Sequence, residues 1–134
     1  MLVECEDGVY RVDLSEEGEE LAEFAPGGRL TARPRPVELV PPFVSSQLVD
    51  VDAVGATIAI LVNRRPPLLV SRDAGSTWNE QGAGLPAGRC LAVGENPDDI
   101  VYGGRNRLFL SHDGGRFWRA LLVELPEILG VAWE

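Results

Sequence analysis

The chain has 134 residues, of which 45% are hydrophobic and 25% are charged, and its formal net charge is −9. That length supports one domain with a buried core, and the hydrophobic content excludes a chain that is disordered throughout. The acidic balance argues against a nucleic-acid-binding surface, which is normally basic. No apolar run reaches the ~18 residues of a membrane helix, so no membrane partner is expected. Fifteen Gly and ten Pro favour many short strands and turns.

The first 24 residues carry nine acidic side chains and only Arg11 as a counter-charge. A solvated acidic edge explains this pattern, and a patch for a basic partner or a metal is the alternative. The start lacks a basic stretch followed by an apolar run, so no signal peptide is expected and the chain is predicted to be cytoplasmic. Cys5 and Cys90 lack metal-ligand spacing and are expected to be single buried thiols.

Residues 25–45 form a proline-dense segment with five prolines. Proline removes a backbone donor and fixes φ, so neither a helix nor a central strand is expected here. Two interpretations remain open for this segment. It is either a rigid cover over the mouth of a channel formed by its neighbours, or a binding loop.

A repeat with a period of 40 residues follows. Four residues of one stretch recur at constant spacing in the next, and the dipeptide Leu85-Pro86 recurs further along as Leu125-Pro126. Periods of this length are typical of propellers, whose blades are four-stranded sheets. The recurring residues are Ser71, Asp73, Gly75 and Trp78, followed by Ser111, Asp113, Gly115 and Trp118.

The repeated motif resembles the Asp-box, or BNR repeat, with the pattern Ser-x-Asp-x-Gly-x-Thr-Trp. Residues 71–78 match every defined position, and residues 111–118 depart only at Phe117, which replaces the threonine. Proteins with such boxes include sialidases, other glycoside hydrolases, sortilin-like receptors and photosystem assembly factors. The resemblance covers residues 46–134 and, by inference, 1–24. It implies an all-β propeller.

The residue types of the motif suit a tight turn between two strands. Ser and Asp side chains cap turn N–H groups, and glycine tolerates positive φ. The tryptophans can cover a neighbouring strand. We therefore expect these residues to be structural and the two aspartates not to be catalytic. The set is Ser71, Asp73, Gly75, Thr77, Trp78, Ser111, Asp113, Gly115 and Trp118.

Two complete blades are predicted, at residues 46–86 and 87–126. Short apolar runs separated by turn residues place the strands of the second blade at 90–93, 100–102, 107–110 and 117–123. The corresponding strands of the first blade are expected at 48–51, 57–62 and 68–70, and from 77 onward.

The two ends of the chain complement each other as a third, split blade. Residues 127–134 repeat a first strand, while 1–24 supply candidate strands at 2–3, 8–12 and 21–24, with a degenerate turn at 15–18. Three blades are fewer than the ~4–8 of typical propellers. We therefore expect a homodimer with six blades, in which the Trp133 strand of each chain completes the first blade of its partner by strand exchange. A trimer with nine blades would preserve the same exchange.

A group of arginines is predicted to gather on one loop face. They come from the loops between the second and third strands of the two complete blades and from the proline-dense segment. Guanidinium groups hold carboxylate or phosphate groups in a bidentate manner, so this face is a candidate anion site, and solvated loop arginines are the alternative. The candidates are Arg64, Arg65, Arg105, Arg107, Arg33 and Arg35.

The sequence offers no recognisable set of catalytic residues. Sialidase-like enzymes use a tyrosine nucleophile, but Tyr10 and Tyr102 are both placed within strands. His112 lies inside a box turn on the opposite face, and no phosphate-loop or metal motif is present. We expect no catalytic residues, no metal and no cofactor.

The function expected is a non-enzymatic binding or assembly module built on an Asp-box propeller. Its partners would be a second copy and an unknown protein or small anionic ligand. Two alternatives remain open. One is a glycoside hydrolase or lyase of Asp-box type, and the other is a small-anion- or sugar-binding protein.

Overall fold

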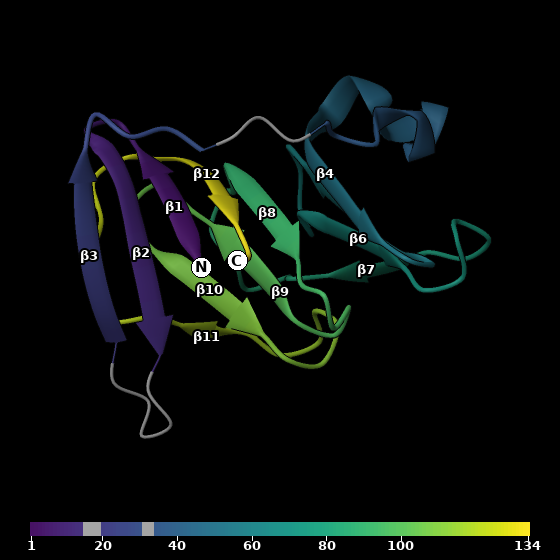
Figure 1. Ribbon diagram of the computed structural model, residues 1–134. Coiled ribbons are helices and arrows are strands. Elements are labelled where there is room, and N and C mark those ends of the chain that lie inside the picture. The colour runs from purple at the N-terminus through teal and green to yellow at the C-terminus, as the bar shows by residue number, and fades with distance from the viewer. Residues whose placement is uncertain (15–19, 31–33) are drawn as a thin grey trace.

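The computed structural model describes residues 1–14, 20–30 and 34–134. Within this part the chain forms twelve strands, gathered into three antiparallel sheets of four strands each, and two short 3-10 helices (Figure 1). The predicted all-β class is confirmed. None of the helices in the described ranges is long and apolar enough to cross a membrane.

The first complete sheet consists of β4 (Leu48–Val54), β5 (Thr57–Val62), β6 (Leu68–Ser71) and β7 (Asn79–Gln81), in that order. β5 is buried along its whole length because both of its faces are covered. Ala59 and Leu61 pack toward the next sheet. Ile58 and Ile60 pack on the opposite side.

The second complete sheet follows the same plan with β8 (Cys90–Val93), β9 (Ile100–Gly103), β10 (Leu108–Ser111) and β11 (Arg119–Ala120). The predicted strands lie within a residue or two of the observed ones, except at the outer edge. The expected strand at 117–123 shrinks to the two residues of β11. Its start moves to Arg119 because the turn extends further, since the N–H of Phe117 bonds to the Asp113 carboxylate.

The third sheet joins the two ends of the chain. β12 (Ile128–Ala132) lies beside β1 (Leu2–Cys5), which is followed by β2 (Gly8–Leu14) and β3 (Glu20–Pro26). Val3 lies opposite Val131, and Leu2 lies opposite Ala132. The degenerate turn predicted at 15–18 falls outside the described residues.

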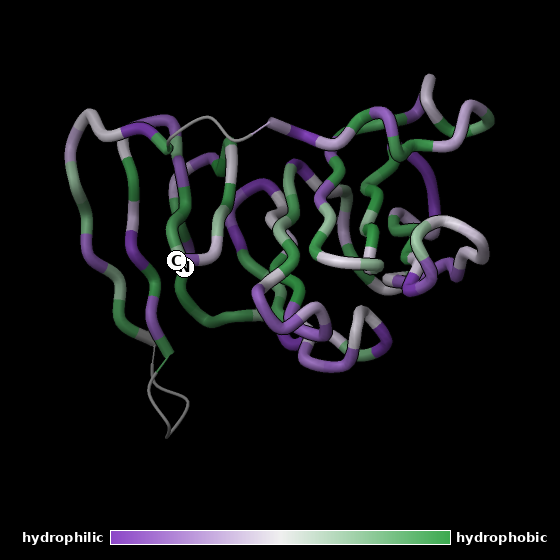
Figure 2. The backbone as a smooth tube through the Cα atoms, turned by 45° about the vertical axis from the view of Figure 1, so that its right-hand side comes forward, coloured by the Kyte–Doolittle hydropathy of each residue, from purple (hydrophilic) through white to green (hydrophobic). Residues whose placement is uncertain are grey.

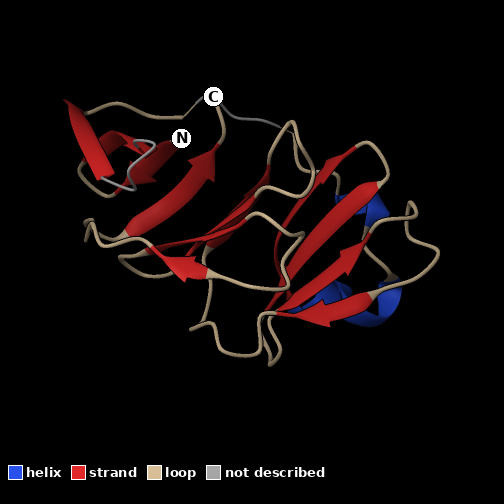
Figure 3. Ribbon diagram, turned by 90° about the horizontal axis from the view of Figure 1, so that it is seen from below, coloured by secondary structure: helices blue, strands red, loops and turns tan. Residues whose placement is uncertain are grey.

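β12 pairs with β1 of the same chain, whereas the sequence led us to expect pairing with β1 of a partner. Strand exchange between two chains stays a prediction. The expectation assumed that pairing within one chain would force a closed ring of three blades. In the structure β8 lies between β4 and β12, and the three sheets stand side by side without closing a ring (Figure 3). Both edges are therefore satisfied within one molecule.

The hydrophobic core lies between successive sheets. One cluster, which includes Val3, Cys90 and Ile128, joins the split sheet to the middle sheet. A second cluster, which includes Leu61 and Tyr102, joins the middle sheet to the β4–β7 sheet. Figure 2 shows hydrophobic colour along many of the strands and hydrophilic colour at several connecting loops.

The proline-dense segment was expected to contain no helix, but it does. Short 3-10 helices form at η1 (Val37–Leu39) and η2 (Pro42–Gln47), because proline is tolerated in the first turn of a helix, as Pro42 is here. Val44 is 2% exposed and packs against Val51 and Ile58. The segment therefore covers the free face of the β4–β7 sheet, at the far end of the row of sheets (Figure 3).

Candidate functional site

The first box, residues 71–78, is a hairpin turn between β6 and β7. The Ser71 hydroxyl accepts the Gly75 N–H at 2.8 Å and donates to the Asp73 carboxylate at 2.8 Å. The same carboxylate accepts the N–H of Thr77 at 2.8 Å and its hydroxyl at 2.5 Å. These bonds, led by the Thr77 hydroxyl, lower the pKa of Asp73 to about 2. Gly75 has φ +96°, a conformation that glycine adopts most readily.

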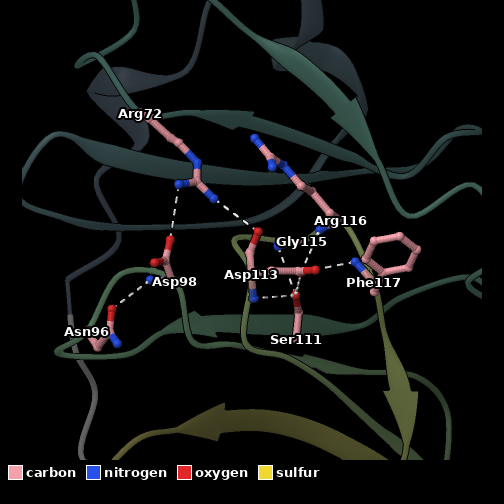
Figure 4. A network of polar contacts seen from close by, with 8 residues as sticks. All are labelled: Arg72, Asn96, Asp98, Ser111, Asp113, Gly115, Arg116 and Phe117. Atoms are coloured by element: carbon pink, nitrogen blue, oxygen red, sulfur yellow. Dashed lines mark hydrogen bonds and ion pairs between the residues drawn. The ribbon is translucent and has the colours of Figure 1, made fainter.

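The second box, residues 111–118, repeats this geometry (Figure 4). The Ser111 hydroxyl accepts the Gly115 N–H at 2.9 Å, and the Asp113 carboxylate accepts the N–H groups of Arg116 and Phe117. The Phe117 N–H is the leading cause of the lowered pKa of Asp113. Phe117 has no hydroxyl to donate. The Asp113 carboxylate therefore receives one hydrogen bond from Phe117, whereas Asp73 receives two from Thr77, the equivalent residue of the first box.

Arg72 of the first box connects the two boxes. Its guanidinium lies 3.1 Å from the Asp98 carboxylate and donates to the Asp113 carbonyl at 3.0 Å (Figure 4). The N–H of Gly114 donates to the Asp98 carbonyl at 2.9 Å, which holds the turn beneath the guanidinium. The box residues thus link neighbouring sheets as well as capping their own turns.

A buried acidic pair on β4 was not anticipated from the sequence. Asp50 accepts the N–H of Leu91 at 3.0 Å, and Asp52 accepts the N–H of Val93 at 2.8 Å. Both carboxylates thereby bond to the backbone of β8 in the next sheet. Two acidic residues spaced by two within an apolar strand share one face, and that pattern could have predicted the pair.

Arg35 from the proline-dense segment completes this group. Its Nε lies 3.3 Å from the Asp50 carboxylate, and its Nη1 lies 3.9 Å from Asp52. The side chain of Asp52 is only 1% exposed. Burial raises the pKa of Asp50, while the Leu91 N–H and Arg35 act in the opposite direction. The oxygens of this pair are turned toward the protein's own donors.

The candidate arginines have different partners in the structure. Arg35 faces Asp50 and Asp52, and Arg33 lies outside the described residues. In the β9–β10 loop, Arg105 Nε lies 3.7 Å from Glu127, and Arg107 donates to Glu124 at 2.7 Å. These arginines therefore already have carboxylate partners.

Arg64 and Arg65, in the β5–β6 loop, line a pocket of about 240 Å³. The opposite wall is the segment between β7 and β8, where Leu85 accepts a 2.7 Å bond from Arg65 Nη1. Arg64 and Arg65 thus share one cavity. It is the candidate functional site.

The remaining reactive side chains have local partners or are buried. The Tyr102 hydroxyl donates to the Pro86 carbonyl at 2.6 Å, and Nδ1 of the exposed His112 lies 2.7 Å from Asp99. Cys5 and Cys90 are buried free thiols, as expected. Burial raises the pKa of Cys5 to about 11 and that of Cys90 to about 12. Among the described residues, no group of three or more His, Cys, Asp or Glu side chains is placed to hold a metal ion.

The fold is thus an all-β array of three four-stranded antiparallel sheets. No protein-family model, no curated protein and no solved structure matches this chain.

Proposed function

We propose that the chain is half of an Asp-box propeller and serves as a non-enzymatic binding and assembly module, with two copies completing a ring of six blades. The observation that supports this proposal is the position of the exposed apolar side chains. Nine large hydrophobic side chains are exposed among the described residues, and seven of them belong to the two end sheets or their covering segment. One end carries Val37, Leu39, Phe43 and Val49, and the other carries Leu21, Phe24 and Leu129.

One end has an exposed aromatic side chain, and the other end has a pocket. At one end, Phe43 projects from η2 and is 72% exposed. At the other end, a pocket of about 210 Å³ is lined by four apolar residues, Leu2, Val9, Phe24 and Ala25, and by the charged Arg11 and Glu23. We expect Phe43 of one copy to enter this pocket of the other, and two-fold symmetry produces the contact twice. Burial of each phenylalanine would contribute about 1.5–3 kcal/mol.

The continuity of the packing favours a second copy as the occupant. Each sheet already packs face to face against its neighbour within the chain, through the clusters that contain Val3 and Leu61. Ring closure by a second copy would repeat this arrangement at the two ends. It differs from the strand exchange expected from the sequence, because every sheet stays within its own chain.

The aspartates of β4 and of the two boxes are already occupied by hydrogen bonds within the protein, and this supports a binding module over a glycoside hydrolase. Glycoside hydrolysis needs two carboxyl groups that reach the substrate, about 5–9.5 Å apart. Asp50 and Asp52 accept N–H groups of β8 and face Arg35. Asp73 and Asp113 accept hydrogen bonds within their own turns.

The assembly is tested by light scattering coupled to gel filtration at about 50 µM. We expect the mass of two chains for the native sequence, and at least about tenfold weaker association for Phe43→Asp. Phe117→Asp is the matched control, since Phe117 is 79% exposed but lies on the middle sheet. A folded native monomer, a mass of three chains, or a Phe43→Asp variant that associates normally would contradict the six-bladed dimer. Hydrolysis of nitrophenyl glycosides by the purified protein would contradict the non-enzymatic assignment.

A further inference from the structure

The pocket beside Arg64 and Arg65 contains no acidic side chain. Its volume is about 240 Å³, and its lining comes from the β5–β6 loop and from the segment between β7 and β8. Apart from the two arginines and Asn63, the lining is small or apolar. Two cationic groups that face no carboxylate are unusual in a chain with a net charge of −9.

The internal repeat explains why a carboxylate is lacking here. Arg65 and Arg105 occupy the same place in successive repeats, 40 residues apart. Arg105 faces Glu127 at 3.7 Å. The residue that corresponds to Glu127 in the earlier repeat is Ala87, which lines the pocket. The pocket therefore lies where the next repeat places a carboxylate of its own.

The two guanidinium groups have donors to spare. Arg65 uses Nη1 for its 2.7 Å bond to the Leu85 carbonyl, which holds the group across the pocket. Arg64 is half-buried and makes no hydrogen bond or ion pair with any residue in the described ranges. Each guanidinium carries five N–H donors, so both can still engage an anion.

The opposite wall of the pocket is held in place. The Tyr102 hydroxyl donates to the Pro86 carbonyl at 2.6 Å. At Gly88 a side chain would collide with that same hydroxyl, so the backbone approaches Tyr102 closely. A wall fixed in this way lowers the ordering cost of binding a ligand.

We propose that this pocket binds the carboxylate of a small organic acid, in the place that Glu127 takes beside Arg105. Arginine and carboxylate form charge-assisted, often bidentate hydrogen bonds. Pro86 and Ala87 line the pocket and are exposed, so they offer apolar surface for a short hydrocarbon body. A free acid and the C-terminal carboxylate of a peptide share this chemistry. The site lies within one chain and does not depend on the proposed dimer.

The test is a titration of the ¹⁵N-labelled full-length protein with butyrate, followed by NMR. We expect saturable shifts in residues 63–65 and 85–88, with a dissociation constant on the order of millimolar, and no saturable shifts with butyramide. Arg64→Gln should weaken butyrate binding by at least about tenfold. Ala87→Glu should abolish it, because the new carboxylate would occupy the site. Arg105→Gln is the matched control and should bind as the native chain does.

The proposal would be overturned if the native chain showed no saturable shifts. It would also be overturned if Arg64→Gln and Ala87→Glu bound butyrate with the same affinity as the native chain. Equal saturable binding of inorganic phosphate would overturn the preference for a carboxylate. A short peptide with a free C-terminus, compared with its amide, distinguishes the two carboxylate sources. Phe43→Asp should bind butyrate normally, so failure of the dimer and failure of this site are separable.

Discussion

Arg72 in the first box donates a 3.0 Å hydrogen bond to the backbone carbonyl of Asp113, 41 residues away in the second box, so the two turns are joined directly (Figure 4). The adjacent residue, Gly114, has φ +74°, and a side chain there would collide with the Arg72 guanidinium. The equivalent residue of the first box is Ala74, which holds φ +58° with a side chain. Positions 74 and 114 therefore differ mainly in the contact with Arg72 and less in backbone conformation.

Gly114→Ala should lower the free energy of unfolding by about 2–3 kcal/mol, from backbone strain together with the loss of the Arg72 bond. When Arg72→Ala is already present, the cost of Gly114→Ala should fall to about 1 kcal/mol, because only the strain remains. Urea denaturation of the four chains of this double-mutant cycle measures the difference. Additive effects would show that the two residues are not coupled.

Asp73→Ala should change how stability depends on pH. Its pKa is lowered to about 2 in the folded chain, against ~3.9 in an unfolded one. The contribution of this carboxylate is therefore fully present above about pH 4 and is lost as the pH falls toward 2. We expect the melting temperature of Asp73→Ala to lie below the native value at pH 6 and to converge with it near pH 2. Calorimetry from pH 2 to pH 6 measures this, with Glu80→Ala on the same hairpin as the control. A constant difference at every pH would contradict the assignment.

Phe117→Thr should stabilise the second box. In the first box the Thr77 hydroxyl donates to Asp73, and threonine at 117 could donate to Asp113 in the same way. It would also remove an apolar side chain that is 79% exposed. We expect the melting temperature to rise by about 2–4 °C, as one additional hydrogen bond would produce. Adding Asp113→Ala should cancel the gain, and a gain that persists would refute this mechanism.

Cysteines at positions 2 and 132 should form a disulfide within one chain. Leu2 and Ala132 lie directly opposite each other on β1 and β12, and such pairs fall within the reach of a disulfide. Leu2→Cys with Ala132→Cys should therefore run as a single chain on a non-reducing gel after oxidation. A covalent dimer would instead show that the strands exchange between chains. Leu2→Cys alone controls for reaction with the buried Cys5 and Cys90.

Asp52→Ala should be strongly destabilising, because it leaves the Val93 N–H without its 2.8 Å partner in the interior. We expect a loss of roughly 2–4 kcal/mol in the free energy of unfolding. Asp52→Asn retains an accepting oxygen and should cost less. Asp13→Ala, at an exposed carboxylate, is the control. An effect of Asp52→Ala no larger than that of Asp13→Ala would show that this bond contributes little.

The positions of strands and turns could be predicted from the sequence because they depend on near neighbours. Short continuous apolar runs marked β5 and β9, and the Ser, Asp and Gly of each box lie within five residues of one another. The hydrogen bonds of the boxes are likewise local. The constant period of 40 residues carried the same pattern from one sheet to the next and identified the matching ends of the chain.

Only the tertiary structure decided which distant groups meet. It pairs β12 with β1 inside one chain, and it places the proline-dense segment on the free face of the β4–β7 sheet. It also gives Arg105 a carboxylate partner while Arg65 bonds to a backbone carbonyl. Residue types and spacing show that an arginine lies in a loop, but its partner depends on how that loop packs against a segment some 20 residues away. Such pairing is a property of the assembled sheets, which no local pattern encodes.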